Sequence, residues 1–92
     1  MKEYVVSVDV RVYDANPGWV INLIEDELQD GETVSDVETH LVQEVDGLYH
    51  HVFDFDITCE EHPAKWIVDA INYHLQEDEE VEVNIRYSEQ TL

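Results

Sequence analysis

The sequence predicts an α+β fold in which two helices cover one face of a four-stranded antiparallel sheet. Three observations lead to this prediction. Four segments alternate apolar and polar residues as strands do, and two amphipathic segments begin beside a proline as helices do. Between the second and third strands, Asp46-Gly47 is typical of a two-residue hairpin turn. The result is one domain, residues 1–92, ordered strand, helix, strand, strand, helix, strand.

The first strand is expected over residues 4–13, where every second side chain is apolar. Asn16 then suits the N-cap of a helix, and Pro17 suits its first position, where the missing N–H costs nothing. Apolar residues recur at helical spacing after Trp19 until Gly31, which is a plausible stop.

The second and third strands are expected on either side of Asp46-Gly47. Alternation divides the second strand into two faces: Val37, Thr39, Leu41, Gln43 and Val45 on one, and Asp36, Glu38, His40, Val42 and Glu44 on the other. The third strand divides in the same way: Tyr49, His51, Phe53, Phe55 and Ile57 against His50, Val52, Asp54, Asp56 and Thr58.

The second helix is expected to open at His62-Pro63 and to continue through His74, which falls on its apolar side as a core histidine. The acidic run 77–80 opposes the helix dipole and is expected to be a loop. The last strand then alternates Val81, Val83, Ile85 and Tyr87 with polar residues. This order of elements is that of the ferredoxin-like, split βαβ arrangement.

Packing follows from the strand faces. Both helices are expected on the apolar sheet face, with Trp66 at least half buried and Trp19 also used for packing. That face carries Val8, Val10, Phe53, Phe55, Val83 and Ile85. The opposite face stays open to solvent or to a partner.

Charge is the strongest functional signal. The chain has 23 Asp and Glu residues against 4 Lys and Arg, giving a formal net charge of −19. Such a surface repels nucleic-acid phosphates and anionic membranes and attracts basic partners. We therefore expect no direct nucleic-acid or membrane binding, and a basic protein surface as the partner. General solubility and adaptation to high salt are the alternatives.

The acids that would make this contact fall in three groups. Arg11, Arg86, His40 and His50 lie among the acids of the first group, which is on the open sheet face. On the open sheet face they are Asp9, Asp36, Glu38, Glu44, Asp54, Asp56 and Glu82. On and after the first helix they are Glu25, Asp26, Glu27 and Asp30, and before the last strand Glu77, Asp78, Glu79 and Glu80.

No pattern indicates an enzyme, a cofactor or a metal centre. Asp54-Phe55-Asp56 pairs two carboxylates, but on an open face they lack the unequal environments that acid–base catalysis needs. His50 and His51 are neighbours on a strand and point to opposite faces. Cys59 is the only cysteine, so no intrachain disulfide forms, and a cytoplasmic location is expected.

In size, charge and lack of catalytic motifs the chain resembles phage-encoded inhibitors that imitate nucleic acid, of the anti-CRISPR and anti-restriction type. The resemblance implies a mechanism in which the protein, as a monomer, occupies the basic channel of a nucleic-acid-handling machine. Two alternatives stay open. One is a dimerising or ligand-binding regulatory module, for which Val5, Val42 and Val52 offer apolar contacts, and the other is a subunit of a larger assembly.

Overall fold

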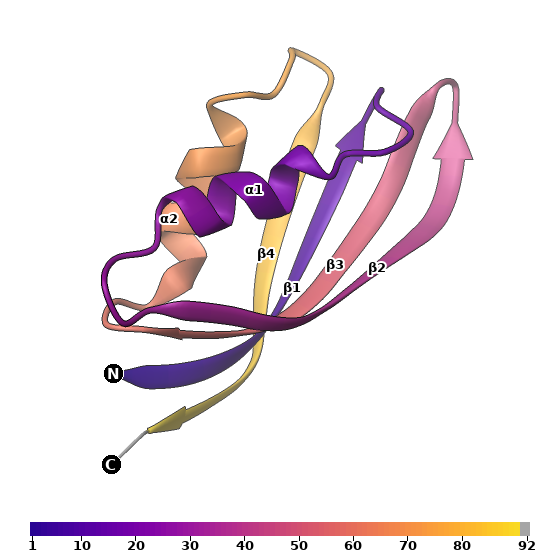
Figure 1. Ribbon diagram of the computed structural model, residues 1–92. Coiled ribbons are helices and arrows are strands. Elements are labelled where there is room, and N and C mark those ends of the chain that lie inside the picture. The colour runs from indigo at the N-terminus through magenta and orange to yellow at the C-terminus, as the bar shows by residue number, and fades with distance from the viewer. Residues whose placement is uncertain (91–92) are drawn as a thin grey trace.

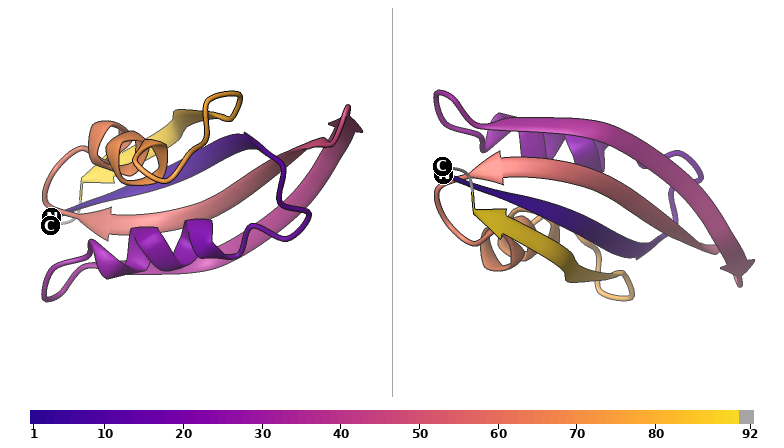
Figure 2. Two further views of the ribbon diagram at one scale, coloured as in Figure 1. Left: turned by 90° about the horizontal axis from the view of Figure 1, so that it is seen from above. Right: turned by 90° about the horizontal axis from the view of Figure 1, so that it is seen from below.

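The computed structural model describes residues 1–90, with side chains described through residue 86. The elements in chain order are β1 (Lys2–Val12), α1 (Trp19–Asp26), β2 (Thr33–Val45), β3 (Leu48–Cys59), α2 (Pro63–Asn72) and β4 (Glu80–Gln90). The strands form one sheet in the order β2-β3-β1-β4, and each neighbouring pair is antiparallel. Both helices lie on the same face of this sheet (Figures 1 and 2). The expected α+β class, with four antiparallel strands and two helices, is confirmed.

The core lies between the helices and the sheet. Alternation along β1 and β3 turns one set of side chains toward the helices, and these are buried while their neighbours are partly exposed. Trp66 is partly buried against this core, as expected. The core residues are Tyr4, Val6, Val8, Val10, Val12, Val20, Ile24, Phe53, Phe55, Ile57, Cys59, Ile67 and Ile71.

The first helix is shorter than expected. It begins at Trp19 with Gly18 as N-cap, so the prediction of Asn16 as N-cap was wrong. The main-chain N–H of Asn16 instead bonds the Asp14 carboxylate at 2.9 Å, and Asn16 belongs to the preceding turn. The helix ends at Asp26, well before Gly31, whose φ of +86° serves the turn that leads into β2.

The second helix begins as expected but ends early. The His62 ring nitrogen Nδ1 accepts the N–H of Ala64 at 3.5 Å, and Pro63 takes the first helical position. The helix stops at Asn72, because the chain then turns to reach β4. His74 consequently lies outside the helix and is exposed, so the prediction of a core histidine was wrong. The side chain of Tyr87 lies outside the described residues.

The hairpin between β2 and β3 forms at Asp46-Gly47, as expected. Both residues have positive φ, 53° and 85°, which is the conformation that this two-residue turn requires. The hairpin extends past the helices at its tip (Figure 1). Leu41, Val42 and Val45 on β2 are therefore more than half exposed.

Strand β2 departs from simple alternation because its pairing with β3 is interrupted twice. The register shifts between Ser35 and Glu38, where Asp36 has a φ of +55°, and again between Leu41 and Gln43. Each shift adds an unpaired residue, which turns the side chains that follow it to the opposite face.

The second shift corrects one predicted site residue. Glu44 pairs with Tyr49 and so shares the face that the helices cover, not the open face. Its carboxylate accepts the main-chain N–H of Gly47 at 2.7 Å and supports the hairpin turn. Gln43, paired with His50, takes the place on the open face that was expected for Glu44.

Candidate binding surfaces

The open sheet face collects the other acids that the sequence placed there. Asp9 pairs with Glu82 on β4 and with Val52 on β3, and Asp54 pairs with Ser7 on β1 and Glu38 on β2. Residues that pair across antiparallel strands share a face. The strand pairing therefore brings the predicted carboxylates of all four strands onto one surface.

Cations on the same face offset part of this charge. Arg86 Nη1 lies 3.4 Å from Asp54 Oδ1, and Arg11 Nη1 lies 3.8 Å from Glu80 Oε2. His40 Nε2 is 3.9 Å from Asp54 Oδ2, and His50 Nε2 is 3.9 Å from Asp9 Oδ2, but an imidazole ring adds positive charge only when it is protonated. Two of the chain's four Lys and Arg residues thus lie on the open sheet face. It is a mixed surface rather than a uniform row of negative charge.

Two carboxyl groups on this face meet directly. The first irregularity of β2 brings Asp36 beside Asp56, where the two carboxyl groups interact. The pKa of Asp56 is raised, first by loss of solvent and then by the hydrogen bond and charge of Asp36. Asp56 therefore holds a proton more firmly than an isolated aspartate does.

The charge elsewhere is largely uncompensated. Among side chains described through residue 86, four carboxylates lie within 4.0 Å of a Lys, Arg or amino-terminal nitrogen: Asp54, Glu60, Asp69 and Glu80. The predicted acids Glu25, Asp26, Glu27 and Asp30 are exposed on α1 and the loop that follows it. None of these four acids has a described Lys, Arg or amino-terminal nitrogen within 4.0 Å.

Acidic side chains also gather at the end of the molecule where α1 stops and α2 starts. A hollow of about 220 Å³ is lined there by Glu27, Gln29, Glu32, Glu60, Glu61 and Trp66. The carboxylate of Glu32 accepts the main-chain N–H groups of Glu60, at 3.0 Å, and Gln29, at 2.8 Å. These bonds lower the pKa of Glu32 and keep it charged.

A groove runs between the two helices and consists of two hollows that share Leu23 and His74. The larger, about 490 Å³, is lined by Leu23, Glu27, Trp66, Asp69, Ala70, Tyr73 and His74. The other, about 370 Å³, is called the Trp19 hollow and is lined by Tyr13, Asp14, Trp19, Leu23, His74, Gln76 and Glu79. The groove combines aromatic rings with carboxylates and contains no Lys or Arg among its lining residues.

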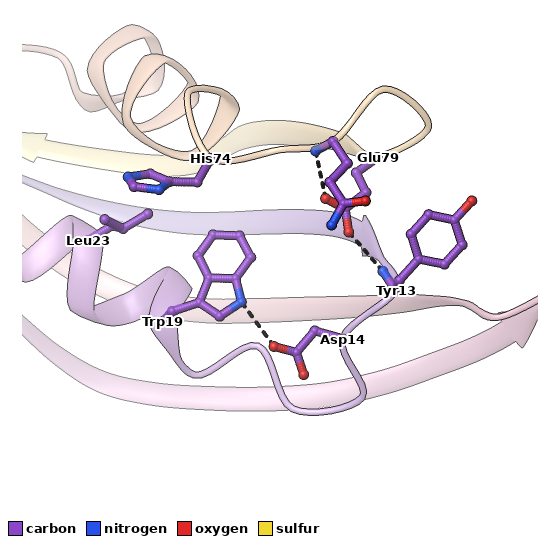
Figure 3. Close-up of a pocket in the computed structure, with 7 residues that line it drawn as sticks. Tyr13, Asp14, Trp19, Leu23, His74 and Glu79 are labelled. Atoms are coloured by element: carbon purple, nitrogen blue, oxygen red, sulfur yellow. Dashed lines mark hydrogen bonds between the residues drawn. The ribbon is translucent and has the colours of Figure 1, made fainter.

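Hydrogen bonds from neutral groups fix both carboxylates of the Trp19 hollow (Figure 3). Glu79 accepts the main-chain N–H of Tyr13 at 2.9 Å and that of Gln76 at 2.7 Å. Asp14 accepts the indole N–H of Trp19 at 3.2 Å, and its other oxygen accepts the N–H of Asn16. These hydrogen bonds orient each carboxylate, and because the donors are neutral they do not offset its negative charge.

The sequence indicated only part of this groove. Glu79 stands among the predicted binding acids, whereas Asp14 and His74 do not, and Trp19 was expected only to pack. Trp19 is partly buried, and its ring lies 6.4 Å from that of His74. The only local sign of this site in the sequence is that the acid Asp14 is followed five residues later by Trp19, and this spacing alone is weak evidence for a site. Of the predicted acids, Glu77 and Asp78 lie in the turn before β4, and Glu80 begins the strand.

The remaining chemical groups are structural. Cys59 is buried, its thiol donates to the carbonyl of Glu61 at 3.0 Å, and burial raises the pKa of the thiol to about 11. Among the side chains described through residue 86, no three of His, Cys, Asp or Glu are arranged to hold a metal ion. In the same part of the chain neither helix has the length and apolar character to cross a membrane.

Comparison with family models and with curated proteins gave no match. No family model matches the chain, and no curated protein matches it at a significant level. The functional argument therefore rests on the residues and their geometry.

Proposed function

We propose that the protein is an acidic inhibitor that binds the basic surface of a nucleic-acid-handling protein or complex and excludes its nucleic acid. The observation that carries the proposal is the excess of exposed carboxylates that have no cation partner. This excess costs self-repulsion in the folded chain, and a basic partner would relieve that repulsion. The proposal includes the phage-inhibitor class, a cytoplasmic location and the absence of enzymatic turnover.

The placement of charge indicates which side would make the contact. The open sheet face already contains Arg11 and Arg86, whereas the exposed acids of α1 have no described cation within ion-pair distance. Unpaired charges contribute more to long-range attraction, because the fields of the two opposite charges of an ion pair nearly cancel at distances greater than their separation. The helix side is therefore the better imitation of a phosphate backbone.

The experiment is competition at low salt. The protein is used to capture partners from a bacterial lysate, and each captured protein is then tested for binding to labelled DNA or RNA with the acidic protein as competitor. We expect displacement of the nucleic acid and steep loss of affinity as salt rises. A partner with an acidic or neutral contact surface would contradict the proposal.

Charge variants on α1 sharpen this test. Glu25 and Asp26 are exposed and unpaired, so Glu25→Lys with Asp26→Lys changes charge without breaking a described contact. Competition should weaken in the amide double variant, Glu25→Gln with Asp26→Asn, and weaken further in the lysine variant. Asp54 is a poorer choice, because its reversal would also break the ion pair with Arg86.

A dimerising regulatory module is the second candidate. The exposed apolar side chains of the edge strand β2, Val37, Leu41, Val42 and Val45, favour it. We also propose the ferredoxin-like class for the fold. The element order and the position of β3 between β1 and β2 support that class. Sedimentation at moderate salt distinguishes the two functions, since an inhibitor of the proposed kind is expected to be a monomer.

A further inference from the structure

We propose that the Trp19 hollow receives an arginine side chain of the basic partner. This inference rests on the proposed function, because it takes the partner to be a basic protein. It goes further in naming the chemical group that is recognised and the place where it binds.

The hollow offers what a guanidinium group requires. Asp14 and Glu79 approach it from the loop after β1 and the loop before β4, and the indole of Trp19 lies beside the space between them (Figure 3). A tryptophan face attracts a cation within about 6 Å of its ring centroid. Carboxylates accept the N–H groups at the edge of the guanidinium plane. An aromatic ring and two carboxylates that line one hollow thus supply the groups that bind a planar cation.

The carboxylates are prepared for such a ligand. Both are held by N–H donors, at distances from 2.7 to 3.2 Å, so binding does not have to order them. All of these donors are neutral, so both groups keep their negative charge. Leu23 and His74 also border the hollow.

The geometry favours arginine over lysine. A guanidinium is planar, so it stacks on an indole while its edge bonds two acceptors, whereas an ammonium is a compact and strongly hydrated point charge. The occupant is a protein side chain because charge complementarity extends along the whole groove. The second hollow continues from Leu23 with Glu27 on its border, and the carboxylate of Glu27 suits a basic residue that flanks the arginine.

The test is a titration of the intact protein, followed by NMR, with N-acetyl-arginine amide as the probe and N-acetyl-lysine amide as its comparison. We expect saturable shifts of the Trp19 indole N–H, small shifts of the Trp66 indole, and weaker binding of the lysine compound. Glu79→Gln removes the charge and one of the two oxygens that accept the N–H groups of Tyr13 and Gln76. It should weaken arginine binding about threefold to fivefold, with the amide spectrum of the variant showing that the loop keeps its structure. Glu77→Gln is the matched control, because Glu77 is an exposed acid of the same turn that does not line the hollow.

The outcomes separate this inference from the proposed function. Equal binding of both compounds, or equal losses in Glu79→Gln and Glu77→Gln, would reduce the site to general attraction and overturn the inference. Competition with a partner's nucleic acid could still be observed in that case. Specific arginine binding without any such competition would support the site and contradict the proposed function.

Discussion

The contact between Asp36 and Asp56 makes a direct test of how the charge affects this fold. Asp56→Asn keeps the shape of the side chain and removes one of two adjacent negative charges. Like charges on neighbouring strands cost about 0.2–1 kcal/mol, and the new amide also donates to Asp36. We expect a gain of about 1 kcal/mol in the free energy of unfolding at neutral pH, equivalent to about 4–8 °C in Tm for a domain of this size.

The gain should depend on pH in a defined direction. Because the pKa of Asp56 is raised by folding, the folded protein binds this proton more tightly than the unfolded chain does. The natural protein therefore gains stability at this site as pH falls through the folded pKa, and the gain is complete below the unfolded value of about 3.8. The advantage of Asp56→Asn should shrink over the same range. The pKa of Glu32 is lowered by folding, so its ionisation contributes less to the stability of both proteins as pH falls. This contribution is the same in the natural protein and in the variant, and it cancels in the comparison.

Urea unfolding at neutral pH and at about pH 4 measures both effects. Asp30→Asn is the control, since Asp30 is an exposed acid in the turn after α1 and has no described contact with another side chain. It should change stability by less than about 0.5 kcal/mol. If Asp56→Asn destabilised the protein at neutral pH, or if its gain did not depend on pH, the interaction between Asp36 and Asp56 would be refuted.

Three further predictions concern stability. Added salt should raise Tm at neutral pH, because screening over a Debye length of about 8 Å weakens carboxylate repulsion; a flat or falling Tm would indicate bound cations or internal pairing. Stability should fall as pH rises from about 9 to about 11, because burial raises the pKa of the Cys59 thiol to about 11, and Cys59→Ala should flatten that slope in denaturant titrations. Phe53→Ala should lower the free energy of unfolding in urea by about 3–5 kcal/mol, because Phe53 is buried in the core. Leu41→Ala should lower it by under about 0.5 kcal/mol, because that side chain is 57% exposed. Equal losses in the two variants would show that the core does not lie where the structure has it.

The sequence predicted the elements well where the local pattern is decisive. Alternation from Tyr4 to Val12 indicated a strand with one buried face, and that face is buried. Asp46-Gly47 indicated a tight turn because few other residues adopt two consecutive positive φ angles at so low a cost, and the turn is present. Periodicity and turn chemistry are properties of short segments, so they can be inferred without the rest of the chain.

The sequence by itself also determined the charge of the protein and the strands that carry the acids expected on the sheet. Only the tertiary structure decided how those acids meet. The irregularities of β2 depend on its pairing with β3, so neither the contact of Asp36 with Asp56 nor the turn of Glu44 to the covered face could be inferred from alternation. The Trp19 hollow likewise joins Asp14 to Glu79, 65 positions along the chain, which lie together because β1 and β4 are neighbours in the sheet. The pairing of strands that are distant in the sequence determines where such groups lie, and no local sequence pattern predicts that pairing.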